Sequence, residues 1–326
     1  MPESQTTYRE AIRQALTDLL RQDPKVVLLG EDIAAAGGSF KVTDGLVEEF
    51  GARVMDTPIS ETGFIGASIG MALAGFRPVA ELMFADFAAV AYDQIVNEAA
   101  KYLYLSAGQM PVPMVVRTVG GAGLGFASQH SQTTESWYFN IPGLKVVVPA
   151  NPQDAYGLML SAAADPNPVI YIEHKALYAS KGPLDTSLQG VPLGRAALAR
   201  PGRDVTVVAS MAMVREALAA ADSLAKLGIE AEVIDLRSLV PLDLETILES
   251  VAKTSRLVVV EEQPVAGGWG GHVVASVCEQ GLDTLDLPPV RMGTAPAPIP
   301  FSSQLEALAV PSAATISARV QALMGQ

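Results

Sequence analysis

Short runs of β-branched residues alternate with longer segments whose pattern predicts helices, and this alternation limits the fold more than any other feature of the chain. The predicted strands of the first half are residues 26–29, 78–82, 114–117, 145–148 and 169–172. The predicted helices are residues 8–21, 63–74, 87–104 and 154–164. This order is typical of a parallel sheet covered by helices on both faces, so the predicted fold class is α/β.

The alternation lapses after Tyr178, where residues 180–192 are rich in Gly, Pro and Asp, as in an exposed connector. It then resumes, with predicted strands at 205–208, 231–234 and 257–260 and predicted helices at 212–226, 242–252 and 271–280. We therefore predict one domain over residues 1–184, a linker over 185–200 and a smaller α/β domain over 201–326.

Composition excludes several classes of protein. The 326 residues include 22 Lys+Arg and 35 Asp+Glu, and an acidic chain repels nucleic-acid phosphates. The single cysteine, Cys278, rules out a disulfide scaffold and indicates a reducing cytoplasm. The longest uncharged stretches, residues 62–76 and 102–116, fall short of the ~20 residues of a membrane span. With no signal or transit peptide indicated, we expect a cytoplasmic protein that binds neither nucleic acid nor membrane.

Two glycine motifs mimic known sites. Residues 120–125, Gly-Gly-Ala-Gly-Leu-Gly, lack the strand-to-helix spacing of a dinucleotide fingerprint, and we interpret them as a loop that allows close approach of a ligand or subunit. Residues 66–70, Gly-Ala-Ser-Ile-Gly, match the nucleophile elbow of serine hydrolases, but Ser68 lies inside a predicted helix. The glycines there favour tight helix packing, and a serine hydrolase remains an alternative.

His130 stands out among three scattered histidines, because hydroxyl and amide side chains surround it in Ser128-Gln129-His130-Ser131-Gln132. Neither the histidines nor Cys278 has the spacing of a zinc site. A structural and a functional role for His130 both stay open on these residues alone.

Glu61 is the leading candidate for acid–base chemistry. It lies between Ile59 and Phe64 and precedes a nearly uncharged helix, and burial favours the protonated form of a carboxyl group. Such a group could exchange a proton with a bound heterocycle. A helix N-terminal carboxylate capped by Ser60 is the plainer interpretation.

Polar residues also follow two predicted strands, where open α/β sheets bind ligands. Glu31 and Asp32 follow the first strand, and Glu261, Glu262 and Gln263 follow a strand of the second domain. We interpret Glu261 and Glu262 as solvated loop carboxylates.

Ordered markers along nearly the whole chain resemble the beta subunit of the thiamine-diphosphate-dependent component of 2-oxo acid dehydrogenase complexes, the pyruvate, branched-chain and acetoin dehydrogenase family. In order, they are Leu29-Gly30-Glu31-Asp32, Asp56-Thr57-Pro58-Ile59-Ser60-Glu61, Gly75-Phe76-Arg77-Pro78-Val79, Asp93-Gln94, Gln129-His130-Ser131-Gln132, Pro142-Gly143-Leu144-Lys145-Val146-Val147, Glu173-His174-Lys175-Ala176-Leu177-Tyr178 and Gly267-Gly268-Trp269-Gly270.

The resemblance implies a transketolase-like pyrimidine-binding domain followed by a transketolase C-terminal-like domain. It implies that thiamine diphosphate is shared with an alpha subunit in an alpha-2 beta-2 heterotetramer. The alpha subunit would hold the diphosphate and magnesium, and this chain indeed contains no Gly-Asp-Gly sequence. By resemblance, Glu61 would bond the pyrimidine nitrogen N1′, and Phe87 would stack on the ring.

Further roles follow from the same resemblance. Ile59 and Glu31 would lie at the cofactor, with Glu31 and Asp93 on an acidic path between paired sites. His130 would help to transfer the acyl group to a lipoyl arm. Backbone carbonyls near Ala162, Asp165 and Asn167 would hold potassium.

The implied activity is that of an oxidoreductase that passes an acyl group to a lipoyl disulfide. Residues 201–326 contain 8 basic and 15 acidic residues, which suits a basic partner, in this family the subunit-binding domain of the lipoyl acyltransferase core. Ile59, His174 and Ala176 are closer to pyruvate or acetoin members than to branched-chain members. Pyruvate, branched-chain 2-oxo acids and acetoin stay open as substrates, and a non-catalytic scaffold is a further alternative.

Overall fold

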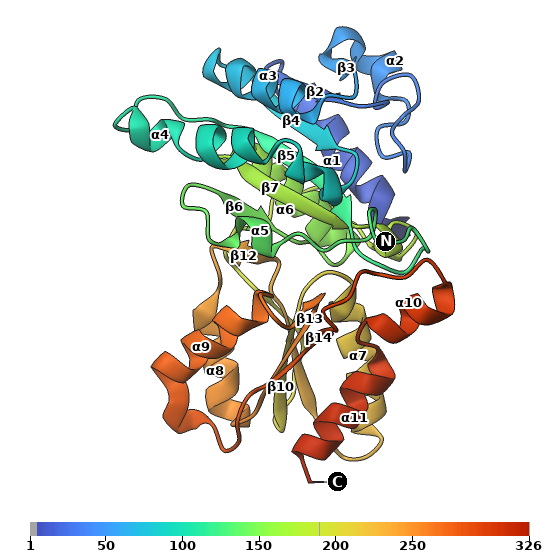
Figure 1. Ribbon diagram of the computed structural model, residues 1–326, viewed down its shortest axis with the longest axis vertical. Coiled ribbons are helices and arrows are strands. Elements are labelled where there is room, and N and C mark those ends of the chain that lie inside the picture. The colour runs from blue at the N-terminus through green and yellow to red at the C-terminus, as the bar shows by residue number, and fades with distance from the viewer. Residues whose placement is uncertain (1–4, 189, 326) are drawn as a thin grey trace. The chain divides into compact units, whose positions relative to one another are not determined.

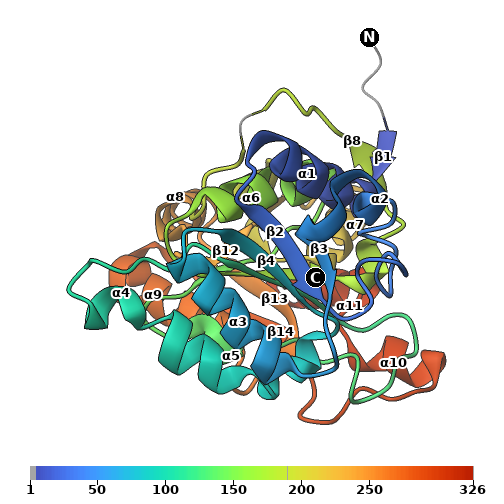
Figure 2. The same ribbon diagram turned by 90° about the horizontal axis from the view of Figure 1, so that it is seen from above.

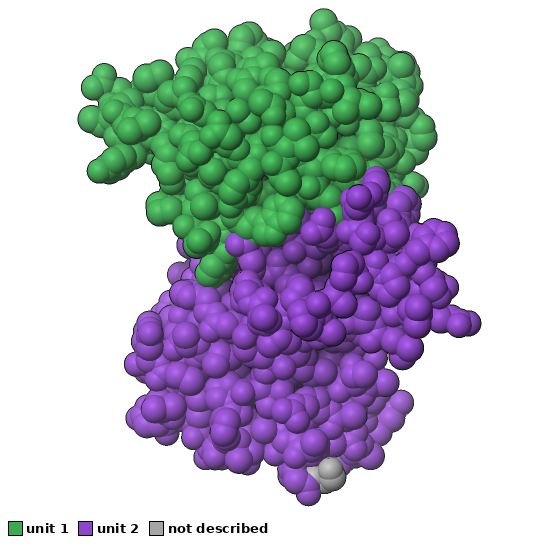
Figure 3. All heavy atoms as spheres, in the orientation of Figure 1, with its two compact units in different colours: residues 1–120, 137–193 green, residues 121–136, 194–326 purple. Residues whose placement is uncertain are grey.

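The computed structural model describes residues 5–188 and 190–325, and the chain divides into two compact units (Figure 3). The first unit comprises residues 1–120 and 137–193, and the second comprises residues 121–136 and 194–326. The second unit therefore includes residues 121–136, which the chain reaches in the middle of the first. We call residues 121–136 the inserted segment. The predicted linker, residues 185–200, includes strand β9 (Ala197–Arg200).

The first unit contains a parallel sheet with the strand order β6-β7-β5-β4-β2-β3. Helices α1 and α6 cover one face and α3 covers the other (Figure 2). Strands covered on both faces need apolar side chains throughout, which is why β-branched runs mark them in the sequence. The bounds are β2 (Val26–Gly30), β3 (Val54–Asp56), β4 (Arg77–Leu82), β5 (Val115–Gly120), β6 (Lys145–Val147), β7 (Val169–His174), α1 (Tyr8–Gln22), α3 (Glu61–Leu73) and α6 (Pro152–Ala164).

Local signals fix where α1 and α6 begin. Thr7 and Glu10 form a capping box at the start of α1, with the Thr7 amide 2.9 Å from Glu10 Oε2. Asn151 caps α6 by accepting the Asp154 amide at 2.9 Å. The shorter elements are β1 (Gln5–Thr7) paired with β8 (Lys181–Pro183), α2 (Leu46–Phe50), α4 (Tyr102–Leu105) and α5 (Ser136–Phe139).

The predicted helix over residues 87–104 is confirmed only in part, because the chain there forms three short helical pieces and not one continuous helix. A 3-10 helix (Ala85–Ala89) and a π-helix (Gln94–Ala99) precede α4. Bonds to the rest of the unit compete with a regular helix: the Thr62 hydroxyl donates to the Val90 carbonyl at 2.7 Å, and the Ala100 carbonyl abuts Gly143. Tertiary contacts here outweigh the helical periodicity of the sequence.

Gly143 is expected to tolerate no side chain. Its φ is +102°, and an added Cβ would lie 2.0 Å from the Ala100 carbonyl oxygen. We expect Gly143→Ala to lower the free energy of unfolding by roughly 2 kcal/mol, since strain and a backbone clash add. Gly75→Ala is the matched control, because Gly75 has φ +93° with nothing within 4 Å of the added Cβ. Equal losses in the two variants, measured by thermal unfolding, would contradict a role for the clash.

The second unit contains a five-stranded sheet with the order β14-β13-β10-β11-β9, in which only β9 runs antiparallel. Helices α7 and α11 lie on one face of it and α8 and α9 on the other (Figure 1). The predicted α/β class is confirmed in both units. The bounds are β10 (Val205–Ala209), β11 (Ala231–Asp235), β12 (Ser238–Val240), β13 (Leu257–Pro264), β14 (Val290–Thr294), α7 (Ala212–Ala225), α8 (Leu244–Thr254), α9 (Gly270–Gly281), α10 (Ser303–Ala309) and α11 (Ala313–Leu323).

Strand β13 extends past its predicted end, and the interpretation of Glu261 and Glu262 as solvated loop carboxylates is wrong. Glu261 is 0% exposed and Glu262 is 7% exposed. The Glu261 carboxylate accepts the Gly270 amide at 3.0 Å and pairs with Arg291 at 2.8 Å. A Cβ on Gly268 would lie 2.2 Å from Glu261 Oε2. The glycines of residues 267–270 therefore leave room for a buried carboxylate at the start of α9.

Across the described residues, no helix is long and apolar enough to cross a membrane.

Candidate functional site

The carboxyl edge of the first sheet brings together residues from three of the predicted site segments. Glu31 follows β2, Thr57 follows β3, Glu61 opens α3, and Phe87 lies in the 3-10 helix after β4. Because β2 lies between β3 and β4, these segments leave the sheet side by side. The Thr57 amide donates to the Gly30 carbonyl at 2.9 Å, which joins the first two segments.

Glu61 is the first residue of α3, as the plainer interpretation predicted, and it is also buried, with 7% of its surface exposed. The predicted Ser60 cap is wrong, because its side chain makes no capping hydrogen bond. Ile59 is 84% exposed, so it does not help Phe64 to bury the carboxyl group, as the sequence had suggested.

Glu31 is the second buried carboxyl group at this edge, 5% exposed. Burial, and then the negative charges of Glu61 and Asp32, raise the pKa of Glu31. Its Oε1 atom and the hydroxyl of Thr57 are buried with no hydrogen-bond partner among residues 5–188 and 190–325. Buried acceptors without a donor, next to a second carboxylate, are typical of a ligand site for a group that carries N–H donors.

Phe87 is half-buried and belongs to an aromatic cluster. Its ring meets Phe84 edge-on, with centroids 6.0 Å apart, and Phe84 meets Phe40 at 5.7 Å. The Thr62–Val90 bond ties the start of α3 to the end of the 3-10 helix that carries Phe87. Asp93, on the predicted acidic path, is exposed and accepts the Asn97 amide at 2.7 Å.

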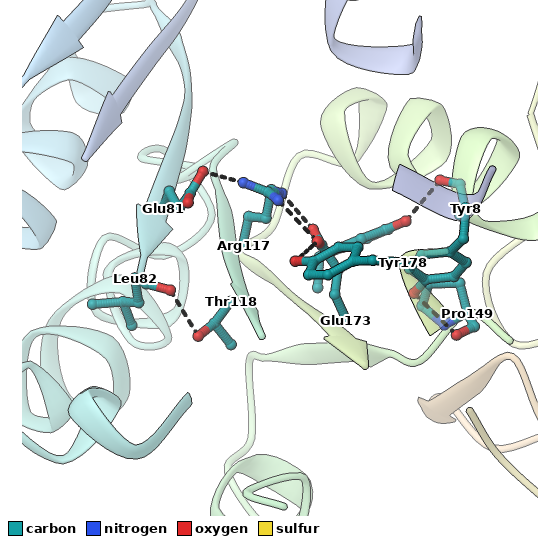
Figure 4. A network of polar contacts seen from close by, with 10 residues as sticks. Tyr8, Glu81, Leu82, Arg117, Thr118, Pro149, Glu173 and Tyr178 are labelled. Atoms are coloured by element: carbon teal, nitrogen blue, oxygen red, sulfur yellow. Dashed lines mark hydrogen bonds and ion pairs between the residues drawn. The ribbon is translucent and has the colours of Figure 1, made fainter. Parts of the chain in front are cut away.

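A buried ion network, missed by the sequence analysis, crosses three strands of the same sheet (Figure 4). Arg117 on β5 is 3% exposed and pairs with Glu81 on β4 and Glu173 on β7. The Tyr178 hydroxyl donates to Glu173 at 2.6 Å. Burial by itself lowers the pKa of Arg117, but the charges of Glu173 and Glu81 outweigh it and hold the guanidinium protonated. The signal was a charged residue within or directly after an apolar run, at positions 81, 117 and 173.

His130 lies in the inserted segment and therefore in the second unit, while Glu61, Glu31 and Phe87 lie in the first. The His130 side chain is half-buried. Three residues of the second unit hold the segment around it: Glu262, Gln263 and Glu306. The bonded partners are 127 residues or more apart in the sequence, so no local signal pointed to these contacts.

Glu135, at the end of the inserted segment, gives a prediction for pH dependence. Burial raises its pKa from 4.5 to about 8, despite a 2.6 Å hydrogen bond from the Gln263 amide. A carboxyl group protonated in the folded state but ionised when unfolded costs stability as the pH rises from about 4.5 to about 8.

Glu135→Gln should therefore gain stability over the wild type across that window, with a limiting slope of about 1.4 kcal/mol per pH unit, and level off above it. The measurement is chemical unfolding at a series of pH values. Glu279→Gln, at an exposed position on α9, serves as the control. If the free energies of unfolding of Glu135→Gln and the wild type differ by the same amount at every pH, the raised pKa of Glu135 is contradicted.

The residues predicted for potassium lie at the end of α6. The Asp165 carboxylate pairs with Lys145 and accepts the Asn167 backbone amide at 2.9 Å. The Ala162 carbonyl accepts the Asp165 amide at 3.3 Å. No group of three or more His, Cys, Asp and Glu side chains that could hold a metal occurs in the described part of the chain. Potassium on backbone carbonyls stays a prediction.

Ser68 lacks the setting of a hydrolase nucleophile. It is 0% exposed inside α3, and its hydroxyl donates to the Phe64 carbonyl at 2.8 Å. A nucleophile elbow needs an exposed serine between a strand and a helix.

Comparison with known proteins matches both units. The family model "Transketolase, pyrimidine binding domain" covers residues 4–181, and "Transketolase, C-terminal domain" covers residues 194–316. The chain is 46% identical over 311 residues to pyruvate dehydrogenase E1 component subunit beta-2 of Oryza sativa, covering 94% of this chain and 82% of that protein.

It is also 44% identical to the acetoin:2,6-dichlorophenolindophenol oxidoreductase subunit beta of Cupriavidus necator, over 96% of each chain. A solved structure, "Split gene transketolase, inactive beta4 tetramer", has a TM-score of 0.81 and 27% identity over 96% of each chain. The architecture and these matches show that the chain belongs to the family of E1 beta subunits of pyruvate and acetoin dehydrogenases, built from transketolase pyrimidine-binding and C-terminal domains.

Proposed function

We propose that this chain is the beta subunit of a thiamine-diphosphate-dependent 2-oxo acid or acetoin dehydrogenase, and that Glu61 activates the cofactor. The observation that carries the proposal is the buried Glu61 carboxyl group beside Glu31 at the carboxyl edge of the pyrimidine-binding domain. The 44% identity to the Cupriavidus necator subunit and the 46% identity to the rice subunit support the dehydrogenase class.

The residues at this edge suit an aminopyrimidine. The unpartnered Glu31 and Thr57 oxygens can accept from N–H donors, and the half-buried Phe87 ring can stack on a flat heterocycle. When bound, thiamine diphosphate supplies a carbon that holds the electron pair released as a 2-oxo acid loses carbon dioxide or acetoin is cleaved. Glu61 would hold a proton at the pyrimidine nitrogen N1′. The exposed Ile59 would border the ring.

The rest of the cofactor site would belong to an alpha subunit. This chain has no Gly-Asp-Gly sequence, so magnesium and the diphosphate would be held by that partner in an alpha-2 beta-2 assembly. Potassium would bind to the carbonyls near Ala162, Asp165 and Asn167, where it would brace the end of α6. The acidic second domain would engage the subunit-binding domain of a lipoyl acyltransferase core.

His130 would act after the substrate bond is cleaved. An imidazole carries a proton on one ring nitrogen and can accept a proton on the other, which suits the transfer of an acyl group to a lipoyl disulfide, where a thiol forms. We include in this proposal that a lipoyl disulfide accepts the acyl group and that the assembled enzyme is therefore an oxidoreductase.

Reconstitution tests the proposal. The chain is purified with its alpha subunit, thiamine diphosphate and magnesium, and pyruvate, branched-chain 2-oxo acids and acetoin are assayed with 2,6-dichlorophenolindophenol as electron acceptor. We expect no turnover by the isolated chain and turnover by the assembly, with pyruvate or acetoin preferred. Ester hydrolysis by the isolated chain that Ser68→Ala abolishes would favour the hydrolase alternative instead.

A further inference from the structure

The inserted segment is held only in part by contacts of its own, among them a 3.3 Å hydrogen bond from the Gly121 amide to the Gln132 carbonyl. Ala122 is buried, but Leu124 and Phe126 remain 50% and 39% exposed, so burial of these two larger side chains does not hold the glycine-rich part. Gly121, Gly123 and Gly125 have φ values of +88°, +102° and +70°. Glycine adopts such angles freely but also leaves them freely, since it lacks a Cβ. The conformation of this part must therefore be held by bonds to other residues.

Two carboxylates supply those bonds. Glu306 on α10 is 3% exposed and uses both oxygens, accepting the Gly123 amide at 2.8 Å and the Gly125 amide at 2.9 Å. Glu262 on β13 accepts the Ala122 amide at 2.5 Å. Hydrogen bonds between a backbone N–H and an ionised carboxylate are about twice as strong as neutral ones. Three amides within four residues are thus fixed by two buried glutamates.

The other end of the segment is held by the residue that follows Glu262. Gln263 donates from Nε2 to the Thr133 carbonyl at 2.9 Å, and its Oε1 accepts the Ser136 hydroxyl at 2.5 Å. His130 lies between the two anchored ends. Strand β13 therefore fixes both ends, while Glu306 clamps the glycines from a separate helix.

We propose that Glu306 and Glu262 are positioning residues for His130, which hold the inserted segment in the conformation that presents the imidazole to the acyl group during transfer. This inference rests on the proposed function, because it assumes that His130 serves acyl transfer. It goes further in assigning two glutamates to one step of the reaction. Neither glutamate would touch cofactor or substrate.

The test is Glu306→Gln in the assembled enzyme with thiamine diphosphate and magnesium. Glutamine keeps the size, but its NH₂ group would face one of the two glycine amides, so one accepting oxygen is lost. Two rates are measured: reduction of 2,6-dichlorophenolindophenol, which bypasses lipoyl transfer, and acyl transfer to free lipoamide. We expect kcat for lipoamide to fall about tenfold, as for the loss of one charge-assisted hydrogen bond, with the dye rate changed less than twofold.

Hydrogen exchange on the same assembly tests the anchor itself. The amides of Gly123 and Gly125 should exchange at least tenfold faster in Glu306→Gln, and Glu262→Gln should do the same at Ala122. Glu279→Gln, at an exposed carboxylate of α9, should change neither rate nor exchange. Glu262→Gln is also the second variant for the rate measurements if Glu306→Gln does not assemble.

The outcomes distinguish a failure of the positioning role from a failure of the proposed function. Faster exchange with an unchanged ratio of lipoamide to dye rates would overturn the positioning role and leave the proposed function standing. Unchanged exchange at Gly123 and Gly125 would overturn the anchor. A wild-type assembly that reduces no dye with any of the three substrates would overturn the proposed function, and the inference with it.

Discussion

Glu61→Gln is expected to lower turnover by the assembled enzyme by roughly 10²- to 10⁴-fold, the range for loss of a positioned acid–base group. Glutamine has the same size and can still accept a hydrogen bond at the start of α3. It cannot hold a transferable proton at the pyrimidine nitrogen. The measurement is dye reduction with saturating substrate and thiamine diphosphate, together with the thermal unfolding midpoint.

The comparison must separate chemistry from folding. Glu48→Gln, at an exposed position on α2, removes a carboxylate from the same unit and should leave turnover unchanged. The midpoint of thermal unfolding of Glu61→Gln should lie within a few degrees of the wild-type value, since Glu61 lies at the start of α3 and, among residues 5–188 and 190–325, not in an ion pair. Full activity of Glu61→Gln would support the scaffold alternative and contradict the proposed role of the carboxyl group.

Arg117→Met should cause the largest loss of stability in the first unit. The change leaves Glu173, 0% exposed, and the largely buried Glu81 without their cation. Breaking a buried ion pair by removing one partner costs about 3–5 kcal/mol, because the remaining charge stays desolvated. For a unit of this size, we expect the midpoint of thermal unfolding to fall by roughly 6–20 °C.

A double variant tests the cause of that loss. In Arg117→Met/Glu173→Gln, one of the two uncompensated charges is gone, so part of the stability should return. Arg203→Met, at an exposed arginine of the second unit, is the control and should change the midpoint little. If the double variant is less stable than Arg117→Met, the loss comes from packing and not from stranded charge.

Strand and helix positions followed from the sequence where burial alone decides them. The runs at residues 26–29 and 205–208 became β2 and β10 to within one residue, because apolar β-branched residues suit strands covered on both faces. Residues 87–104 form three short helical pieces and not one continuous helix, because a hydrogen bond from Thr62 and close contact with Gly143 compete with a regular helix. Periodicity measures local preference and carries no information about such distant partners.

The candidate site was predictable in part for the same reason. Glu31 directly follows β2 and Glu61 is the first residue of α3, both at the sheet edge where ligands bind. The order of the strands was therefore enough to place them. The exposure of Ile59 was not predictable, because neighbours in sequence need not share an environment. Glu306 was out of reach altogether, since 183 residues separate it from the amide of Gly123.

That separation also matters while the protein is being made. A ribosome completes the inserted segment long before it adds Glu262 and Glu306, which come 140 and 183 residues after the amides they bind. At about 5–20 residues per second, Ala122 and the two glycines leave the exit tunnel roughly 7 to 37 seconds before their anchors. During that interval the nascent first unit must fold around an unattached loop, a stage at which a chaperone or a protease could engage it.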